Sequence, residues 1–382
     1  MFTFPEDSPQ YAALLKFQSR RVMHLRLKEA LDSLGDAGNP SRADSFMALV
    51  GPSGVGKSVA VEEFIKRINM SYATELESDP SFVPAILVRL PAPIRGDFNW
   101  KDAFIRTLER FNEPLIRRKV IQRMLVELDG EVIGNLPSLV AEELRRALRS
   151  CVIHRGTKII AFDEGSHLFI VRSRSQLSLQ LKLVKSLKND IEIPMILAAT
   201  YELIKPENFD SQLLRRSDVV HFRRYTAEDL LSGNSYGNSF RDAIHTMLHA
   251  LPVEWDQSLV NHADYFLMRS VGCVGILKTW LQRALERSLH HNLPVDGTLL
   301  EATAFSNYKL MTMLKEAVAG EALLKDIKED DLARELGFDY IPTTSSRKPS
   351  TSSESRRPVK KCRPGTRKPG RDPIGGESND LC

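Results

Sequence analysis

The chain has 382 residues, of which 42% are hydrophobic and 27% charged, and its net charge at pH 7 is +4. These values are typical of a globular protein, and the length allows two or three domains of about 100 to 200 residues each. No apolar run approaches the ~20 residues of a membrane span, and the N-terminal MFTFPEDSPQ lacks the features of a secretory signal. We therefore exclude a membrane protein and expect a cytoplasmic one.

Residues 1–40 are predicted to form an N-terminal helical segment. Between Tyr11 and Leu34, apolar residues recur at helical spacing among Arg and Lys, which predicts one or two amphipathic helices. The run GDAGNPSRAD then interrupts the pattern with turn-forming residues.

Residues 41–225 alternate short apolar runs with amphipathic stretches. Strands are predicted at FMALVG, PAILVRL, KIIAFD, IPMILAAT and DVVHF, each bounded by turn residues or charge. Helices of crossover length are predicted at Val59–Asn69, Trp100–Phe111, Leu139–His154 and Leu177–Asn189. Strands that alternate with helices predict an α/β fold, with a mostly parallel sheet covered by helices on both faces.

Residues 226–335 are predicted to form a small all-helical domain. Its helices are expected at Ala227–Leu231, Ser239–Leu251, Asp256–Arg269, Ile276–His291 and Leu299–Met313. After Met313 we expect little further folded structure, and no appended winged-helix domain.

The C-terminal residues 341–382 differ in composition from the rest. They hold 10 Lys and Arg against 4 Asp and Glu, which leaves 43 against 45 for residues 1–340. They are also rich in Ser, Thr, Pro and Gly and poor in large apolar residues, so they cannot bury enough surface to offset the entropy of ordering. We predict a disordered basic tail. The cysteines Cys151, Cys273, Cys362 and Cys382 have none of the paired spacings of a zinc site or a disulfide framework.

The clearest motif is GPSGVGKS at residues 51–58, a full G-x-x-x-x-G-K-[ST] between a predicted strand and a predicted helix. Its glycines let backbone N–H groups turn toward phosphates, and the helix that follows presents its positive N-terminus. Lys57 would reach the β- and γ-phosphates, and Ser58 would supply a magnesium ligand. The alternative is a glycine-rich turn that binds nothing. We expect ATP and Mg²⁺ to bind, with contacts from Gly51, Pro52, Ser53, Gly54, Val55, Gly56, Lys57 and Ser58.

The second motif, KIIAFDE at residues 158–164, is an apolar strand that ends in two carboxylates, as in a Walker B element. Asp163 would hold magnesium together with Ser58, and Glu164 would orient or deprotonate the attacking water. Alternatively, the acidic pair only caps a helix. The two motifs together predict an ATPase.

Two further sites are predicted at the carboxyl edge of the sheet, where such folds bind ligands. Thr200 ends a strand there and would sense the γ-phosphate, or else only cap a helix. In the segment QLLRRSD, Arg215 or Arg216 would reach the γ-phosphate of a neighbouring subunit, as an arginine does in many oligomeric ATPases. A solvated basic turn is the alternative.

These motifs resemble those of an AAA+ ATPase and, more narrowly, of the TnsC/TniB family of transposition regulators. The narrower resemblance rests on GPSGVGKS after a helical segment, VPAILVRLPAP, the Asp-Glu pair followed by His167, LVKSLKNDIEIPMILAATYEL, and SVGCVG opening a lid helix. It implies an ATP-dependent adaptor that polymerises on duplex DNA, is recruited by a target-selection protein, and passes the site to a transposase. It also implies that Lys278 of the lid contacts nucleotide. Because Lys278 replaces the usual sensor arginine and Thr200 the usual Asn, we expect slow turnover.

Duplex DNA would be held by basic side chains that contact phosphates without reading bases. A nucleotide at a head-to-tail subunit interface makes a heterologous contact, which builds a ring or a helical filament. The candidates on its inner face are Arg95, Lys101, Arg117, Arg118, Lys119, Arg172 and Arg174. Each could instead be a solvated surface charge. His167 is expected to serve in packing or a polar network, because no second metal ligand lies at helical spacing.

The leading hypothesis is therefore a bacterial, DNA-associated homo-oligomer that regulates transposition and uses ATP hydrolysis to disassemble. One alternative is an initiator or clamp-loader-like ATPase that loads a replication protein. Another is a nucleotide-binding scaffold that does not hydrolyse ATP. The basic tail would either tether DNA or dock on the transposase, and its prolines and small apolar patches favour docking.

Overall fold

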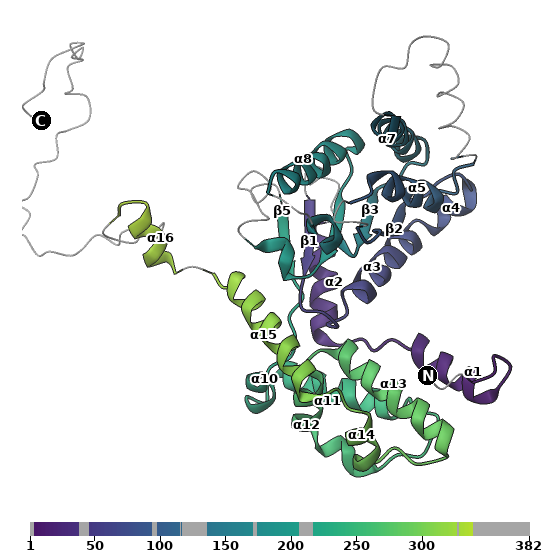
Figure 1. Cartoon of the computed structure of the whole chain (residues 1–382), viewed down its shortest axis with the longest axis vertical. Helices are drawn as coiled ribbons and strands as arrows, with labels where there is room; N and C mark the ends of the chain where they lie inside the picture. The colour runs from purple at the N-terminus through teal and green to yellow at the C-terminus, as the bar shows by residue number, and fades with distance from the viewer. Residues whose placement is uncertain are drawn as a thin grey trace, which may run out of the picture. The chain divides into compact units, whose positions relative to one another are not determined.

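A computed structural model describes residues 4–37, 46–93, 98–114, 116, 136–170, 174–205, 217–326 and 328–338 of the chain. Residues Met1–Lys325 form one compact unit, drawn with its helices and strands labelled in Figure 1, and Asp326–Cys382 form a second. Among the described residues, no helix is both long enough and apolar enough to cross a membrane.

A five-stranded parallel sheet lies at the centre of the first unit. Its strands are β1 (Phe46–Val50), β2 (Ala85–Arg89), β3 (Ile159–Asp163), β4 (Met195–Ala199) and β5 (Ser217–His221). Their order is β2-β3-β4-β1-β5, and every neighbouring pair is parallel. The predicted strands and the predicted parallel sheet are confirmed.

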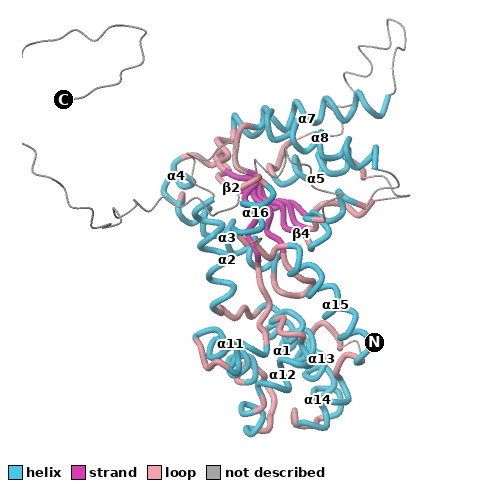
Figure 2. Tube along the Cα trace, turned by 90° about the vertical axis from the view of Figure 1, so that its left-hand side faces the viewer, coloured by secondary structure: helices cyan, strands magenta, loops and turns pink. Residues whose placement is uncertain are grey.

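Helices cover both faces of the sheet, as Figure 2 shows. Along β1, Phe46, Ala48 and Val50 pack into one apolar cluster while Met47 and Leu49 pack into another, because side chains alternate across a strand. The first cluster is shared with α5 (Trp100–Arg110), α7 (Leu136–His154) and α8 (Arg174–Ile191). The second is shared with α2 (Leu25–Ala37) and α3 (Lys57–Ser71). Strands β1 and β4 are buried and apolar along their whole length, and β3 is buried throughout and apolar except for Asp163 at its end, as the sequence indicated.

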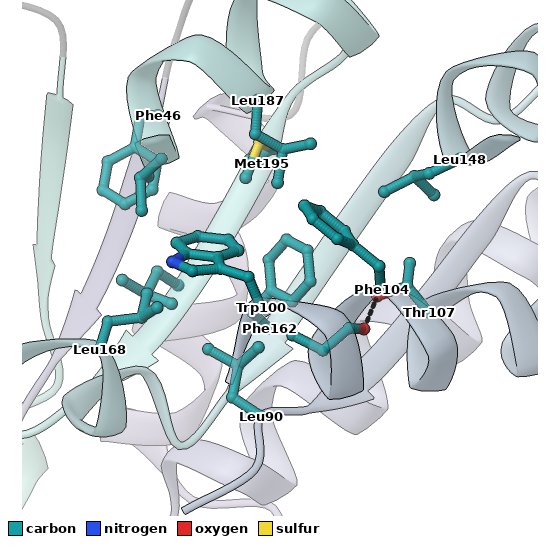
Figure 3. Close-up of a pocket in the computed structure, with 13 residues that line it drawn as sticks. Phe46, Leu90, Trp100, Phe104, Thr107, Leu148, Phe162, Leu168, Leu187 and Met195 are labelled. Carbon is teal, nitrogen blue, oxygen red and sulfur yellow. Dashed lines mark hydrogen bonds between the residues drawn. The ribbon is translucent and has the colours of Figure 1, made fainter. Parts of the chain in front are cut away.

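A small cavity of about 20 Å³ lies in the first cluster, beside Trp100 (Figure 3). Its lining is apolar except for Thr107, whose hydroxyl donates to the carbonyl of Ala103 at 2.7 Å. A buried water needs two or more polar partners, and this lining leaves none open. The cavity is a packing void and not a ligand site.

The helical region after β5 has its own core around Trp280. It contains α10 (Ala227–Leu231), α11 (Ser235–Leu248), α12 (Ala263–Ser270), α13 (Val274–His291) and α14 (Gly297–Thr303). The N-terminal helix α1 (Pro9–Ser19) packs here through Leu14 and Phe17. The predicted N-terminal segment thus divides, since α1 joins the helical region and α2 joins the sheet.

Two predicted single helices are broken in the structure. The stretch Asp256–Arg269 forms a 3-10 helix, η4 (Gln257–Asn261), before α12, and His262 between them is not helical. The stretch Leu299–Met313 is divided between α14 and α15 (Asn307–Leu323), with Ala304 extended at ψ 154°. Ser306 explains the second break, because its side chain accepts the N–H of Lys309 and starts a new helix, whereas no side chain caps α12 at His262.

The expectation that little folded structure follows Met313 is wrong. Helix α15 continues to Leu323, and α16 (Glu329–Glu335) follows in the second unit. In Figure 1, α15 leaves the helical region and runs toward the sheet. There a Cβ on Gly320 would lie 2.0 Å from Cγ of Tyr201, so only glycine permits this close packing.

The edge strand β2 is partly covered by a side chain. Asn69 of α3 accepts a hydrogen bond from the N–H of Ala85 at 3.1 Å and donates to its carbonyl at 3.2 Å. One asparagine therefore satisfies both backbone groups at the start of the edge strand.

Candidate nucleotide-binding site

The carboxyl ends of three adjacent strands bring the predicted site residues together. In the order β3-β4-β1, Asp163 ends β3, Thr200 follows β4, and the P-loop follows β1. Parallel strands end at the same edge of a sheet, so elements more than a hundred residues apart in sequence meet here.

The P-loop has the backbone geometry of an anion cradle. Gly54 and Gly56 have φ values of 76° and 116°, in the region that favours glycine. Helix α3 begins at Lys57, and no side chain caps it. The N–H groups of its first turn therefore point toward the site with the positive end of the helix, as a phosphate requires.

The P-loop packs directly on the helical region. A Cβ on Gly275 of α13 would lie 2.4 Å from the carbonyl oxygen of Gly54. A Cβ on Gly54 would lie 2.5 Å from Cγ1 of Ile276. The first turn of α13 thus covers one side of the P-loop, and glycine on both partners is needed for that contact.

Lys57 is half-buried and points back along the loop. Its ammonium donates to the carbonyls of Gly51 and Pro52, both at 2.9 Å, which uses two of its three N–H donors. Burial lowers the pKa of Lys57 to about 8, against the attraction of Cys273, Asp163 and Glu164. Burial also raises the pKa of Cys273 to about 12, so that its thiol is neutral at pH 7 and only the carboxylates attract the ammonium.

Asp163 has the donor atom expected of a cation ligand. Its Oδ1 accepts the N–H of Glu164 at 2.9 Å. Its Oδ2 is buried and has no hydrogen-bond partner among the described residues, and it forms only a long ion pair with Nη2 of Arg89 at 3.9 Å. A buried carboxylate oxygen without a partner is costly unless a ligand satisfies it. Together with the half-buried Ser58 at the start of α3, it fits Mg²⁺, a hard cation that takes oxygen ligands.

Glu164 is held in an unusual backbone conformation. Its φ is 58°, its side chain is exposed, and it does not cap the 3-10 helix η2 (Gly165–Phe169) that it precedes. The capping role is therefore not the one its carboxylate plays here. A Cβ on Gly165 would lie 2.4 Å from Cγ of Leu197, which fixes the turn against β4. Strain of this kind persists where the surroundings hold it, and it presents Glu164 to the solvent at the site.

Thr200 does not cap η3 (Tyr201–Ile204), the 3-10 helix that it precedes. Its hydroxyl lies 2.9 Å from the hydroxyl of Ser166, which also accepts the N–H of Thr200 at 2.9 Å. Ser166 thus joins the end of β4 to the turn after β3. The sequence did not single it out, although its place two residues after Glu164 was a usable signal.

The remaining predicted residues lie apart or outside the described residues. The ammonium of Lys278 donates to the carbonyls of Gln18 and Arg20, both at 2.6 Å, and so contacts the N-terminal segment. Nδ1 of His167 donates to the carbonyl of Leu90 at 3.2 Å, in agreement with the predicted polar-network role of His167. Lys101 is exposed on α5, and Arg174 is the first residue of α8. Outside the described residues lie Arg95, Arg117, Arg118, Lys119, Arg172, Arg215 and Arg216.

A metal centre of another kind finds no support. Within the described ranges, no group of three or more His, Cys, Asp or Glu side chains is placed to hold a metal ion. Cys151 and Cys273 are buried and are in no disulfide within the described residues, and the Cys151 thiol donates to the Glu113 carboxylate at 3.3 Å.

Comparison with known proteins identifies the domain that carries the site. A family model described as "AAA domain" matches residues 41–205. Similar solved structures include a Walker-type ATPase of Pyrococcus abyssi (17% identity, 84% of this chain and 80% of that chain covered, TM-score 0.43). Another is the Aeropyrum pernix ORC2 protein in ADPNP-ADP complexes (12% identity, 83% of this chain and 73% of that chain covered, TM-score 0.47). A third is Drosophila ORC bound to DNA (11% identity, 90% of this chain and 83% of that chain covered, TM-score 0.45). A comparison with curated proteins finds no match. Residues 41–205 match the AAA domain model, and the predicted AAA+ P-loop fold is confirmed.

Proposed function

We propose that the chain is an ATP-driven switch that assembles on duplex DNA and connects a target-selection protein to a transposase, with hydrolysis controlling disassembly. The observation that carries the nucleotide part is the buried, unpartnered Oδ2 of Asp163 at the sheet edge that also holds the P-loop. The transposition part is supported by the sequence motifs that resemble TnsC/TniB regulators.

The phosphates would bind where the P-loop meets α3. N–H groups of the first turn of α3 would donate to phosphate oxygens. Lys57 would turn its ammonium from the carbonyls of Gly51 and Pro52 toward the β- and γ-phosphates, because phosphate carries more negative charge than a carbonyl. Mg²⁺, held by Ser58 and Asp163, would neutralise charge on the phosphates during transfer.

Hydrolysis would depend on the two elements that end β3 and β4. Glu164, exposed beside Asp163, would orient the attacking water and take its proton. The Thr200 hydroxyl, held by Ser166, would contact the γ-phosphate or that water. Both groups lie at turns that β3 and β4 hold in register, which suits them to positioning.

Assembly would complete the site. An arginine from a neighbouring subunit, Arg215 or Arg216, would stabilise charge on the γ-phosphate. Because such a contact joins two different surfaces, it repeats head to tail and builds a ring or a filament. ATP would then favour assembly, and its hydrolysis would weaken it.

DNA would bind through phosphate contacts along the assembled subunits. The proposed contacts are Arg95, Lys101, Arg117, Arg118, Lys119, Arg172 and Arg174. Each neutralised phosphate releases counterions, so affinity should fall steeply with salt and depend little on sequence. The basic residues 341–382 would dock on the transposase.

Electron microscopy tests this proposal with linear duplex DNA and a non-hydrolysable ATP analogue. We expect rings or filaments on DNA that require the analogue and are absent for Lys57→Ala. Glu164→Gln should form the same assemblies with ATP itself and retain them, because it binds nucleotide but no longer activates water. Closed rings that form without DNA would favour the loader alternative, and normal turnover in Glu164→Gln would remove Glu164 from the mechanism.

A further inference from the structure

A short segment after β5 runs between the P-loop and the helical region. The N–H of Phe222 donates to the carbonyl of Val50 at 2.8 Å, and its own carbonyl lies 2.4 Å from where a Cβ on Gly51 would be. Three residues later, the N–H of Tyr225 donates to the carbonyl of Gly272 at 2.9 Å. Arg223 and Arg224 therefore lie between the P-loop and the residues that lead into α13.

Arg224 is engaged by a carboxylate from the far end of α15. Its Nε lies 2.8 Å from Oε1 of Glu321, and its Nη2 lies 3.2 Å from Oε2. The side chains are 13% and 26% exposed, so the pair is partly shielded from water. This two-point contact is the geometry by which a guanidinium also binds phosphate.

The same end of α15 is fixed at the edge of the sheet where β4 and β5 end. Gly320 packs against the ring of Tyr201, the residue directly after Thr200. The Tyr201 hydroxyl is 2.9 Å from Nε2 of His221, at the end of β5. Glu321 is therefore held beside the strand ends that form the site.

The buried thiol of Cys273 lies among the charges concerned. Burial dominates and raises its pKa, while Arg224 and Lys57 lower it and Glu321 raises it further. The P-loop ammonium, the guanidinium and the α15 carboxylate thus all act on the charge of one small side chain at the N-cap of α13. The backbone of Arg224 lies in the segment that joins the P-loop to the residues before α13.

We propose that Arg224 is a nucleotide-binding residue for which Glu321 and the γ-phosphate of ATP compete. When the γ-phosphate takes the guanidinium, Glu321 loses its partner and the C-terminal end of α15 is released from the sheet. ADP has no γ-phosphate and leaves the pair intact. The inference rests on the proposed function, because it requires ATP at the P-loop.

This exchange would report the nucleotide state to the C-terminal part of the chain. Helix α15 ends at Leu323, close in sequence to the segment proposed to dock on the transposase. The exchange of partners at the Arg224 guanidinium would then change how accessible that segment is to the transposase.

The first test compares the affinities of ADP and of a non-hydrolysable ATP analogue, with Mg²⁺, by competition with a fluorescent nucleotide. Arg224→Ala should weaken the analogue about ten- to hundredfold and leave ADP nearly unchanged, as expected for the loss of a charged hydrogen bond. Glu321→Gln should strengthen the analogue relative to ADP, because Arg224 is freed. Arg224→Lys keeps the positive charge but not the two-point guanidinium contact. Its preference for the analogue over ADP should therefore lie between those of the wild type and of Arg224→Ala.

Arg269→Ala is the matched control. Arg269 is also 13% exposed and also pairs with a carboxylate, Glu301, but it lies at the end of α12. It should leave the preference for the analogue over ADP at the wild-type value. A proportional loss of both nucleotides in Arg224→Ala, or an unchanged ratio in Arg224→Lys and Glu321→Gln, would overturn the proposal.

The second test follows hydrogen exchange in residues 317–323 of the full chain. These amides should exchange faster with the ATP analogue than with ADP, and fast with either nucleotide in Glu321→Gln. Equal exchange in the two nucleotide states of the wild type would overturn the release of α15. If the wild type binds both nucleotides and Lys57→Ala binds neither, the nucleotide part of the proposed function stands whatever these outcomes are. If the folded wild type binds no nucleotide, both proposals fail.

Discussion

The charged groups on the two sides of the nucleotide site differ in whether they have hydrogen-bond partners. The sheet side is formed by the ends of β3 and β4, and the helical side by the segment after β5 and the helical region. On the sheet side, Asp163 keeps a buried carboxylate oxygen without a hydrogen-bond partner, and Glu164 is exposed. On the helical side, Arg224 is paired with Glu321 through two hydrogen bonds.

This difference indicates which charged groups contribute to ligand binding and which contribute to the stability of the fold. An unpartnered buried oxygen destabilises the fold until a ligand satisfies it. A paired cation stabilises or is neutral, and it is available to a ligand only by exchange of partners. We therefore expect changes on the sheet side to act on binding first, and changes on the helical side to act on stability first.

The largest effect is expected for Lys57→Ala, which removes the P-loop ammonium. ATP affinity should fall at least about a hundredfold, or about 2.7 kcal/mol, because no other group replaces the charge at the β- and γ-phosphates. Calorimetric titration measures this loss of ATP affinity. Lys66→Ala, exposed on the same helix, should bind ATP as the wild type does. Equal affinity in both variants would contradict the nucleotide site.

Gly275→Ala should break the contact between the two sides. The new methyl group would lie 2.4 Å from the carbonyl oxygen of Gly54, and backbone on both partners limits the adjustment. We expect a loss of about 1 to 3 kcal/mol in the free energy of unfolding, as for other overpacked contacts. Gly297→Ala is the control, because its Cβ meets nothing within 4 Å. Equal stability of the two variants in urea titrations would disprove the close contact.

Lys57→Met should raise the free energy of unfolding and at the same time abolish ATP binding. A lysine whose folded-state pKa is lowered to about 8 binds protons less well when folded, so its charge costs stability below that pH. At pH 7 the variant should gain about 1 kcal/mol, after the loss of two hydrogen bonds to carbonyls is deducted. The gain should shrink as the pH rises from 8 to 10.5, measured as the difference in unfolding free energy. A gain in unfolding free energy that grew between pH 8 and pH 10.5 would contradict the lowered pKa of Lys57.

Ser166→Ala should have the smallest effect. It removes the hydroxyl that holds the N–H and the side chain of Thr200, at an expected cost of about 1 kcal/mol. It should also slow ATP turnover while nucleotide affinity stays near the wild-type value. Ser71→Ala, an exposed hydroxyl at the end of α3, serves as the control in thermal melts and turnover assays. An unchanged rate would leave Ser166 a purely structural residue.

The sheet and its motifs could be predicted because their signals are local. Buried parallel strands are continuous apolar runs, and the P-loop is eight consecutive residues. Ser166 and Glu321 could not be assigned in this way, because their partners lie 34 and 97 residues away in sequence. The helix breaks at His262 and Ala304 were missed because apolar side chains on both sides of each break pack on the same core, so the helical spacing continues across it.

The asparagine on the edge strand bears on how copies of this protein can meet. An exposed strand edge is a template on which a second molecule can add its own strand, and such pairing leads to runaway aggregation. Asn69 occupies both backbone groups of Ala85, so an incoming strand finds the first position of β2 already taken. For the assembly proposed above, closing this route would mean that contact between copies depends on side chains and not on pairing of strands.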